Sequence, residues 1–292
     1  MKISKAPGVI FFMAIALSLH LFPSDHGGRT RVLPEDARQG TSGPSPSGEI
    51  DLMGHLFRRA DIQPVSVIAG VPAYIWRHGS GPTAAAMVLG YYDGLGFPDL
   101  FPGDAKVQTD TVNQKIASEE HYLDYGLPID SPPLLLPDKS ELPEGDEHAD
   151  NCLADYMWTS QSVYSNYYGW TWGTDVKFGM EEYVRATTSY AIIATTNRFF
   201  NIMWTAVKNE ILSNRPMIFF VDTDADGEPD HFVTVIGVAE ENGVAYYGCY
   251  NTWDTGIHWY PYRQNAPGVS WGVHSVNTVF VEHGVHPPAN FG

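Results

Sequence analysis

The stretch Asp230–Asp254, DHFVTVIGVAEENGVAYYGCYNTWD, decides the fold of this chain. It contains two runs rich in β-branched and aromatic residues, separated by the turn sequence EENG, which is the pattern of a β-hairpin. Two neighbouring antiparallel strands bring the residues near their open ends together, so we expect His231 and Asn251 to lie side by side. A hydrogen bond from the imidazole to the amide oxygen of Asn251 would fix the orientation and tautomer of the ring.

Further strand patterns surround this hairpin, and helical patterns precede it. PMIFFVD (216–222) and VNTVFVE (276–282) have strand character, whereas PTAAAMVLGYY (82–92) starts with a proline suited to a first helical turn and continues as an apolar run. We expect a buried central helix there and an amphipathic helix over 201–212. This order indicates an α+β fold, with a helical half packed against an antiparallel sheet half and a cleft between them.

The N-terminal region differs in composition from the rest of the chain. Residues 1–22 combine Lys2 and Lys5 with an apolar run, which is typical of a cleaved signal peptide and predicts a secreted or extracytoplasmic protein. A retained membrane anchor is the alternative. Residues 23–50 are rich in Gly, Pro and Ser, as expected of a flexible linker. The folded domain is expected over 65–288, and no later run is long and apolar enough to predict a membrane span.

The charge of the chain excludes one class of partner. Asp and Glu outnumber Lys and Arg by 34 to 17, which gives a formal net charge of -17. No basic stretch is present that could follow a phosphate backbone, so nucleic acid is not an expected partner. The acidity favours cationic over anionic peptides as ligands.

The histidine and asparagine region resembles that of papain-like cysteine peptidases. His231 corresponds to their general-base histidine, VTVIG to the strand that follows it, and NTW to their Asn-Ser/Thr-Trp sequence. The resemblance implies that Asn251 orients the histidine and that Trp253 packs beside it. Asp230 matches the first residue of the family's Asp-His pair.

The upstream segment RHGSGPTAAAMVLGYYDG resembles the nucleophile region of the bacteriocin-leader (double-glycine) peptidase-like group, peptidase family C-thirty-nine-like. That group carries Gly-Cys-x-Pro-Thr/Ala before a buried alanine-rich helix, and Ser80 stands at the cysteine position here. The resemblance covers roughly residues 65 to 282. It implies a papain-like fold, with Ser80, His231 and Asn251 at the catalytic positions, a peptide or protein as substrate or ligand, and no required cofactor.

The serine changes the expected chemistry. A cysteine at a helix N-terminus beside a histidine forms a thiolate, whereas the Ser80 hydroxyl is far less acidic and must lose its proton during attack. One interpretation is a catalytically impaired homologue that binds peptide or protein in its cleft. The alternatives are an active peptidase or amidase that uses Ser80, His231 and Asn251, and a structural or calcium-stabilised interaction protein.

An oxyanion-hole donor is harder to assign. Papain-like enzymes combine a glutamine shortly before the nucleophile with the backbone N–H of the nucleophile itself. Tyr74 stands about where that glutamine would be. Its hydroxyl either donates a hydrogen bond at the site or packs in the core.

The run DTDADGEPD suggests a metal. It places Asp222, Asp224, Asp226 and Asp230 at the spacing of the first half of a calcium loop, although the closing glutamate is missing. A tight acidic turn is the alternative to a calcium site.

The sequence does not decide between a disulfide and free thiols for the two cysteines. Cys152 and Cys249 are the only cysteines of the chain. In an oxidising compartment they either form one disulfide or stay buried free thiols.

Overall fold

The computed structural model describes residues 62–125, 139–140, 147–164, 166 and 168–284. Every described residue lies in the unit Leu33–Gly292. The predicted signal peptide (1–22) and linker (23–50) lie outside the described residues, as does the predicted domain end after residue 284.

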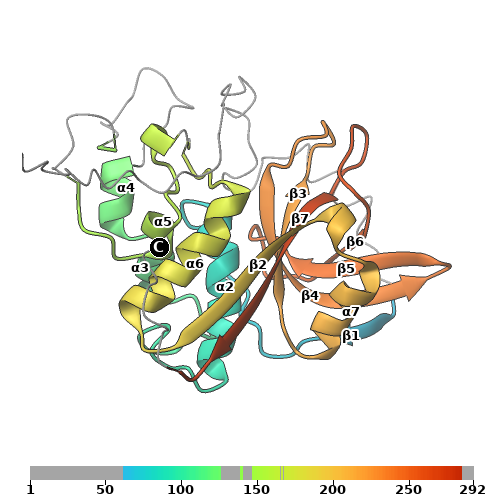
Figure 1. Cartoon of the computed structure of the whole chain (residues 1–292), viewed down its shortest axis with the longest axis horizontal. Helices are drawn as coiled ribbons and strands as arrows, with labels where there is room; N and C mark the ends of the chain where they lie inside the picture. The colour runs from blue at the N-terminus through green and yellow to red at the C-terminus, as the bar shows by residue number, and fades with distance from the viewer. Residues whose placement is uncertain (1–61, 126–138, 141–146, 165, 167, 285–292) are drawn as a thin grey trace, which may run out of the picture. The chain divides into compact units, whose positions relative to one another are not determined.

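Helices dominate the first half of the described chain and strands the second. In chain order the elements are β1 (Pro64–Val67), α2 (Ser80–Gly94), α3 (Asp110–Ile116), α4 (Glu119–Tyr125), α5 (Leu153–Tyr156), η2 (Ser162–Tyr164), α6 (Gly173–Thr187), β2 (Ala191–Arg198), η3 (Phe199–Asn201), α7 (Trp204–Leu212), β3 (Met217–Asp222), β4 (His231–Glu241), β5 (Val244–Tyr250), β6 (His258–Pro261) and β7 (Gly272–Glu282). Helices α2 to α6 gather on one side and the sheet on the other (Figure 1). The predicted α+β architecture is confirmed. Within the described part, no helix has both the length and the apolar character needed to cross a bilayer.

A single antiparallel sheet forms the second half. Among the described residues it has seven strands in the order β2-β7-β3-β4-β5-β6, with β1 paired to β4. The strands of this sheet pair antiparallel throughout, and β4 and β5 form the hairpin expected from the sequence, with Glu241 opposite Val244 at its turn. β4 lies near the centre of the sheet, and the residue at its start, His231, pairs with Val221 of β3.

The helix α2 is the centre of the helical half. Every residue from Ser80 to Tyr92 is buried, as expected for an apolar run with no exposed face. Ala84 and its alanine neighbours present only methyl groups, so the helix approaches β4 closely, and the hydroxyl of Thr234 on β4 donates to the Ala84 carbonyl at 2.9 Å. This contact fixes the N-terminal end of α2 against the start of the sheet.

Helices α5 and α6 meet at a glycine. A Cβ atom on Gly179 would lie 2.7 Å from the carbonyl oxygen of Tyr156 and 2.9 Å from the Cα atom of Met157. Because these are backbone atoms, a side chain at position 179 would force the two helices apart.

Replacing Gly179 with alanine is therefore expected to lower the free energy of unfolding by about 1 to 2 kcal/mol, because the cost of overpacking exceeds the gain in helix propensity. Urea denaturation measures the change. Gly94→Ala is the matched control, since a Cβ atom at Gly94 meets nothing within 4 Å. Equal unfolding free energies for the two variants would contradict the close packing of α5 on α6.

Candidate active site

Ser80 is the first residue of α2 and is fully buried. Its Oγ accepts a hydrogen bond from the backbone N–H of Phe232 at 3.3 Å. Phe232 is the second residue of β4, and the pairing of β4 with β5 begins only at Thr234. The Ser80 hydroxyl thus binds β4 at a residue that has no hydrogen-bonded partner in β5. The start of α2, with Ser80, therefore lies against the start of β4, which carries His231.

His231 is held by the main chain that follows β5. Its Nε2 lies 2.7 Å from the backbone oxygen of Asn251 and 3.3 Å from the hydroxyl of Thr252. A carbonyl oxygen only accepts hydrogen bonds, so Nε2 carries the proton of the neutral ring and Nδ1 carries the lone pair. The ring is therefore fixed in the tautomer in which Nδ1 is the basic nitrogen.

The side chain of Asn251 shapes a turn. Its Oδ1 accepts the backbone N–H groups of Trp253 at 3.0 Å and of Asp254 at 3.2 Å, which is an Asx-type turn. The sequence pattern predicts a bond from the imidazole to this amide oxygen, whereas the described contact from Asn251 to His231 is made by the main-chain carbonyl. The chain leaves β5 sharply here, so the N–H groups of the turn take the amide oxygen.

Two tryptophans enclose the histidine. The ring centroids of Trp253 and His231 lie 4.4 Å apart with an interplanar angle of 30°. Trp271 meets both rings edge-on, at 6.4 Å from His231 and 5.6 Å from Trp253. The imidazole is fully buried as a result. The structure thus places Trp253 at the packing position that the resemblance implies.

Two threonines enclose the N-terminus of α2, and sequence analysis did not find them. A Cβ atom on Gly79 would lie 2.8 Å from Cγ2 of Thr159, and one on Gly81 would lie 3.0 Å from Thr171. The two threonine hydroxyls are 2.7 Å apart. The glycines on either side of Ser80 are therefore required by this close approach, and the Gly-Ser-Gly sequence was the available signal.

Tyr74 lies against the middle of α2. Its hydroxyl donates to the carbonyl of Ala105 and would be 2.7 Å from a Cβ atom on Gly90. Gly90 is ten residues along the helix from Ser80, which corresponds to about 15 Å. The described position is the core-packing alternative for Tyr74, and its hydroxyl is directed away from the helix N-terminus.

The predicted calcium ligands divide into two groups. Ligand oxygens of Asp222, Asp224 and Asp226 lie within 4.8 Å of one another. The carboxylate of Asp230 instead accepts the backbone N–H of Thr223 at 3.0 Å and its hydroxyl at 2.9 Å. Asp230 therefore braces the turn before His231, and the calcium site stays a prediction.

A pocket of about 610 Å³ lies elsewhere, beside α7 and β5. None of the predicted site residues lines it. Its lining is Phe199, Phe200, Ile202, Met203, Trp204, Gly243, Val244, Ala245, Tyr262 and Arg263.

The role of Asn251 in its turn can be tested by two substitutions. Asn251→Ala removes the oxygen that accepts two N–H groups and should lower the free energy of unfolding by about 1 kcal/mol, whereas Asn251→Asp keeps an acceptor and should stay close to the wild type. Denaturant unfolding of the three proteins measures this. An aspartate variant as unstable as the alanine variant would argue against the turn role.

Stability around Asp222 should depend on pH. Burial raises the pKa of Asp222 to about 6, although the N–H groups of Ala225 and Gly227 each donate to its carboxylate at 2.7 Å. Because this folded-state pKa exceeds the ordinary value of 3.8, the folded protein holds the proton more tightly. The protonated Asp222 carboxyl therefore contributes its full stabilisation of the fold below pH 3.8. This stabilisation is lost as the pH rises through about 6.

We therefore expect the unfolding free energy of the wild type, relative to Asp222→Asn, to fall between about pH 4 and about pH 7 with a calcium chelator present. Asp224→Asn is the control, because Asp224 is exposed. If wild-type and Asp222→Asn curves run parallel over this range, the raised pKa is excluded.

Comparison with known proteins gives one family match. The model of the Peptidase_C39 like family matches residues 68–272, a span that includes Ser80, His231 and Asn251. No curated protein matches the chain.

Several solved structures are similar to this chain at low identity. UfSP from C. elegans is 13% identical with a TM-score of 0.34, covering 80% of this chain and 37% of that chain. Procathepsin B from Trypanosoma congolense is 14% identical with a TM-score of 0.32, covering 86% and 89%. A structure from a study of the mite allergens Blo t 1 and Der p 1 is 12% identical with a TM-score of 0.29, covering 82% and 72%. This chain thus spans well under half of the UfSP chain.

The family model covers more than half of the residues. Within that span, residue 80 begins the buried helix, and residues 231 and 251 lie at the adjoining strand ends. The described part has an α+β fold, and the chain belongs to the Peptidase_C39 like family.

Proposed function

We propose that this protein is an exported papain-like peptidase homologue whose catalysis is impaired by Ser80 and which binds a peptide or protein at the former active site. The observation that carries the proposal is residue 80 itself. A serine begins α2, is fully buried, and accepts a hydrogen bond from Phe232 through its Oγ. Family membership supports the peptidase-like part of the proposal.

The impairment follows from the acidity of the group at the helix N-terminus. The helix dipole stabilises an anion by about 0.3 to 2 kcal/mol, which corresponds to roughly one pKa unit or less for most sites. That is enough to bring a thiol toward its thiolate when a histidine assists, but a serine hydroxyl starts far above the working pH. A hydrogen bond from Phe232 to Ser80 Oγ further lowers the electron density available for attack.

The ligand class rests on charge and export. A net charge of -17 favours cationic segments of a peptide or protein over anionic ones. Export is supported by the signal-like composition of residues 1–22. An extracytoplasmic peptide or protein is therefore the proposed ligand.

One observation favours the active-hydrolase alternative. The tautomer of His231 leaves its Nδ1 lone pair as a base, which is what a serine mechanism requires. In that reaction the Ser80 oxygen attacks the carbonyl carbon, and His231 takes the hydroxyl proton and gives it to the departing amine. Water then hydrolyses the ester and releases the acid.

The deciding experiment restores the thiol. We expect Ser80→Cys to react at residue 80 with a thiol-directed peptidase inhibitor and to cleave members of a broad peptide library, while the wild type does neither. Peptide mass mapping distinguishes labelling at position 80 from labelling at the buried Cys152 and Cys249. Ser80→Ala is the matched control, because it removes the hydroxyl without adding a nucleophile.

The other results of this experiment decide between the alternative functions. Cleavage by the wild type that is lost in Ser80→Ala establishes the serine hydrolase and overturns the proposed impairment. If Ser80→Cys folds and is neither labelled nor active, the site no longer functions as a papain-like centre. If the wild type and Ser80→Ala both fail to bind any peptide of the library, the binding part of the proposal is wrong.

A further inference from the structure

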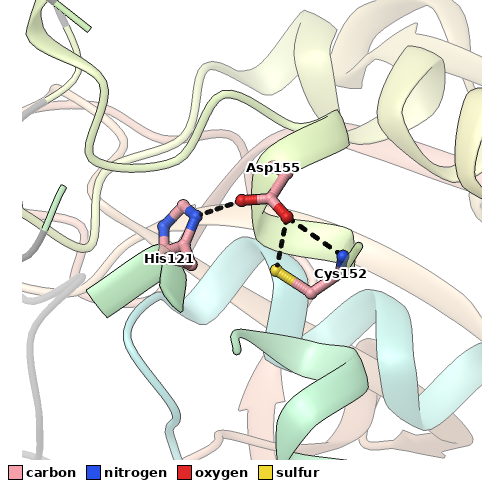
Figure 2. A group of neighbouring side chains, drawn as sticks. All are labelled: His121, Cys152 and Asp155. Carbon is pink, nitrogen blue, oxygen red and sulfur yellow. Dashed lines mark hydrogen bonds and ion pairs between the residues drawn. The ribbon is translucent and has the colours of Figure 1, made fainter. Parts of the chain in front are cut away.

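A second cluster of ionisable side chains lies within the helical half. His121 on α4, Cys152 directly before α5 and Asp155 on α5 are each buried, and their ligand atoms lie within 4.8 Å of one another. Figure 2 shows the three side chains directed toward one another from these two elements. Cys152 and Cys249 are both buried free thiols in the structure, so the disulfide alternative is not formed.

Three potential metal ligands converge on the carboxylate of Asp155. Its Oδ1 lies 2.6 Å from Nδ1 of His121 and 3.1 Å from Nε2 of His148. Its Oδ2 lies 3.1 Å from Sγ of Cys152. The ligand atoms of His121, Cys152 and Asp155 thus form one buried group, and Nε2 of the partly exposed His148 reaches the same carboxylate. Imidazole nitrogen, thiolate sulfur and carboxylate oxygen are the ligand types that zinc prefers.

The residues around this cluster hold its members in place. Nδ1 of His148 lies 2.8 Å from Asp124, and the ammonium group of Lys139 lies 2.8 Å from the same carboxylate. A carboxylate behind a ligating histidine is an outer contact that orients metal ligands in proteins.

The remaining nitrogen of His121 bears on its protonation state. Its Nε2 is buried and has no hydrogen-bond partner among the described residues. A positively charged ring would leave a charged N–H group buried without an acceptor, which is costly. The geometry therefore favours a neutral imidazole, the form that binds metal ions.

We propose that His121, His148, Cys152 and Asp155 bind one zinc ion. A thiolate and a carboxylate balance the charge of the ion, and two neutral imidazoles complete a tetrahedral set, so the buried site is neutral overall. Calcium and magnesium prefer sets made of oxygen ligands, and the sulfur and nitrogen atoms disfavour them. Four protein ligands leave no open position, which is typical of a structural site.

The protons balance in a simple way. Zinc replaces the thiol proton of Cys152, which passes to solvent. His148 carries its proton on Nδ1, where Asp124 accepts it. Nδ1 of His121 donates to Asp155 in the metal-free protein, so zinc binding at this nitrogen requires the ring proton to move to Nε2. Oδ1 of Asp155 binds the ion, while its Oδ2 keeps the backbone N–H groups of Asn151 at 2.9 Å and Cys152 at 3.1 Å.

The site would brace the helical half near Ser80. It joins α4 to α5, and the chain leaves α5 toward Thr159, which contacts the backbone around Gly79. Zinc therefore stabilises the frame of the former active site without touching a substrate. This inference stands apart from the proposed function, because it concerns no residue of that site.

The experiment uses the full chain, reduced and freed of metal with a chelator, and titrated with Co²⁺ as a spectroscopic probe before Zn²⁺. One equivalent should give a thiolate-to-cobalt charge-transfer band and the visible bands of a tetrahedral ion, and Zn²⁺ should remove both and raise the melting temperature. Cys152→Ser should lose the charge-transfer band. Cys249→Ser is the matched control and should keep it, because Cys249 is an equally buried thiol on β5.

The contact between Asp124 and His148 gives a second test, in which zinc binding should be weakened but not lost. Asp124→Asn should weaken zinc binding by about 10- to 100-fold while leaving the stoichiometry at one, as expected when the carboxylate behind a ligating histidine is removed.

Several results would overturn the site. A wild type without a charge-transfer band, a band that persists in Cys152→Ser, or one lost only in Cys249→Ser would each exclude it. If Cys152→Ser does not fold, His148→Gln decides together with the wild-type spectrum, since His148 is partly exposed and its loss should tolerate folding. Unchanged zinc affinity in a folded His148→Gln variant would also overturn the proposal.

Discussion

The contact between α2 and β4 is the constraint on which the site depends. The buried helix approaches the strand closely because its first turns carry alanines, and the hydrogen bond from Thr234 to Ala84 fixes their relative position. Ser80 at the helix start then meets the N–H of Phe232, next to His231 at the strand start. Secondary-structure ends, held by core packing, thus set the geometry of the candidate site residues.

The candidate site has a closely packed frame around Ser80 and His231. Asn251 and Thr252 hold the histidine in one tautomer, Trp253 covers its ring, and glycines admit Thr159 and Thr171 beside the helix start. These contacts do not depend on the atom at the tip of residue 80. Packing therefore preserves the arrangement even where the acidity required for a resting thiolate is absent.

The fold was predictable from sequence because its patterns are local. The hairpin around EENG and the alanine-rich helix follow from periodicity. Ser80 and His231 were singled out by resemblance, and the structure brings the helix start and the strand start that carry them together. β1 and β6 were not predicted because they are only four residues long, and β2 has a single fully buried residue. The backbone role of Asn251, the core position of Tyr74 and the cluster around Asp155 depend on tertiary contacts between distant segments, which no local pattern encodes.

The most direct test is the acidity of a thiol placed at position 80. The ultraviolet absorbance of the thiolate can be titrated with pH in Ser80→Cys and corrected by the wild type, which contains the same two native cysteines. The account predicts a pKa well below the ordinary value of about 8.5, raised again when His231→Ala is added. A pKa at or above the ordinary value that is insensitive to His231 would contradict the claim that a papain-like frame survives around Ser80.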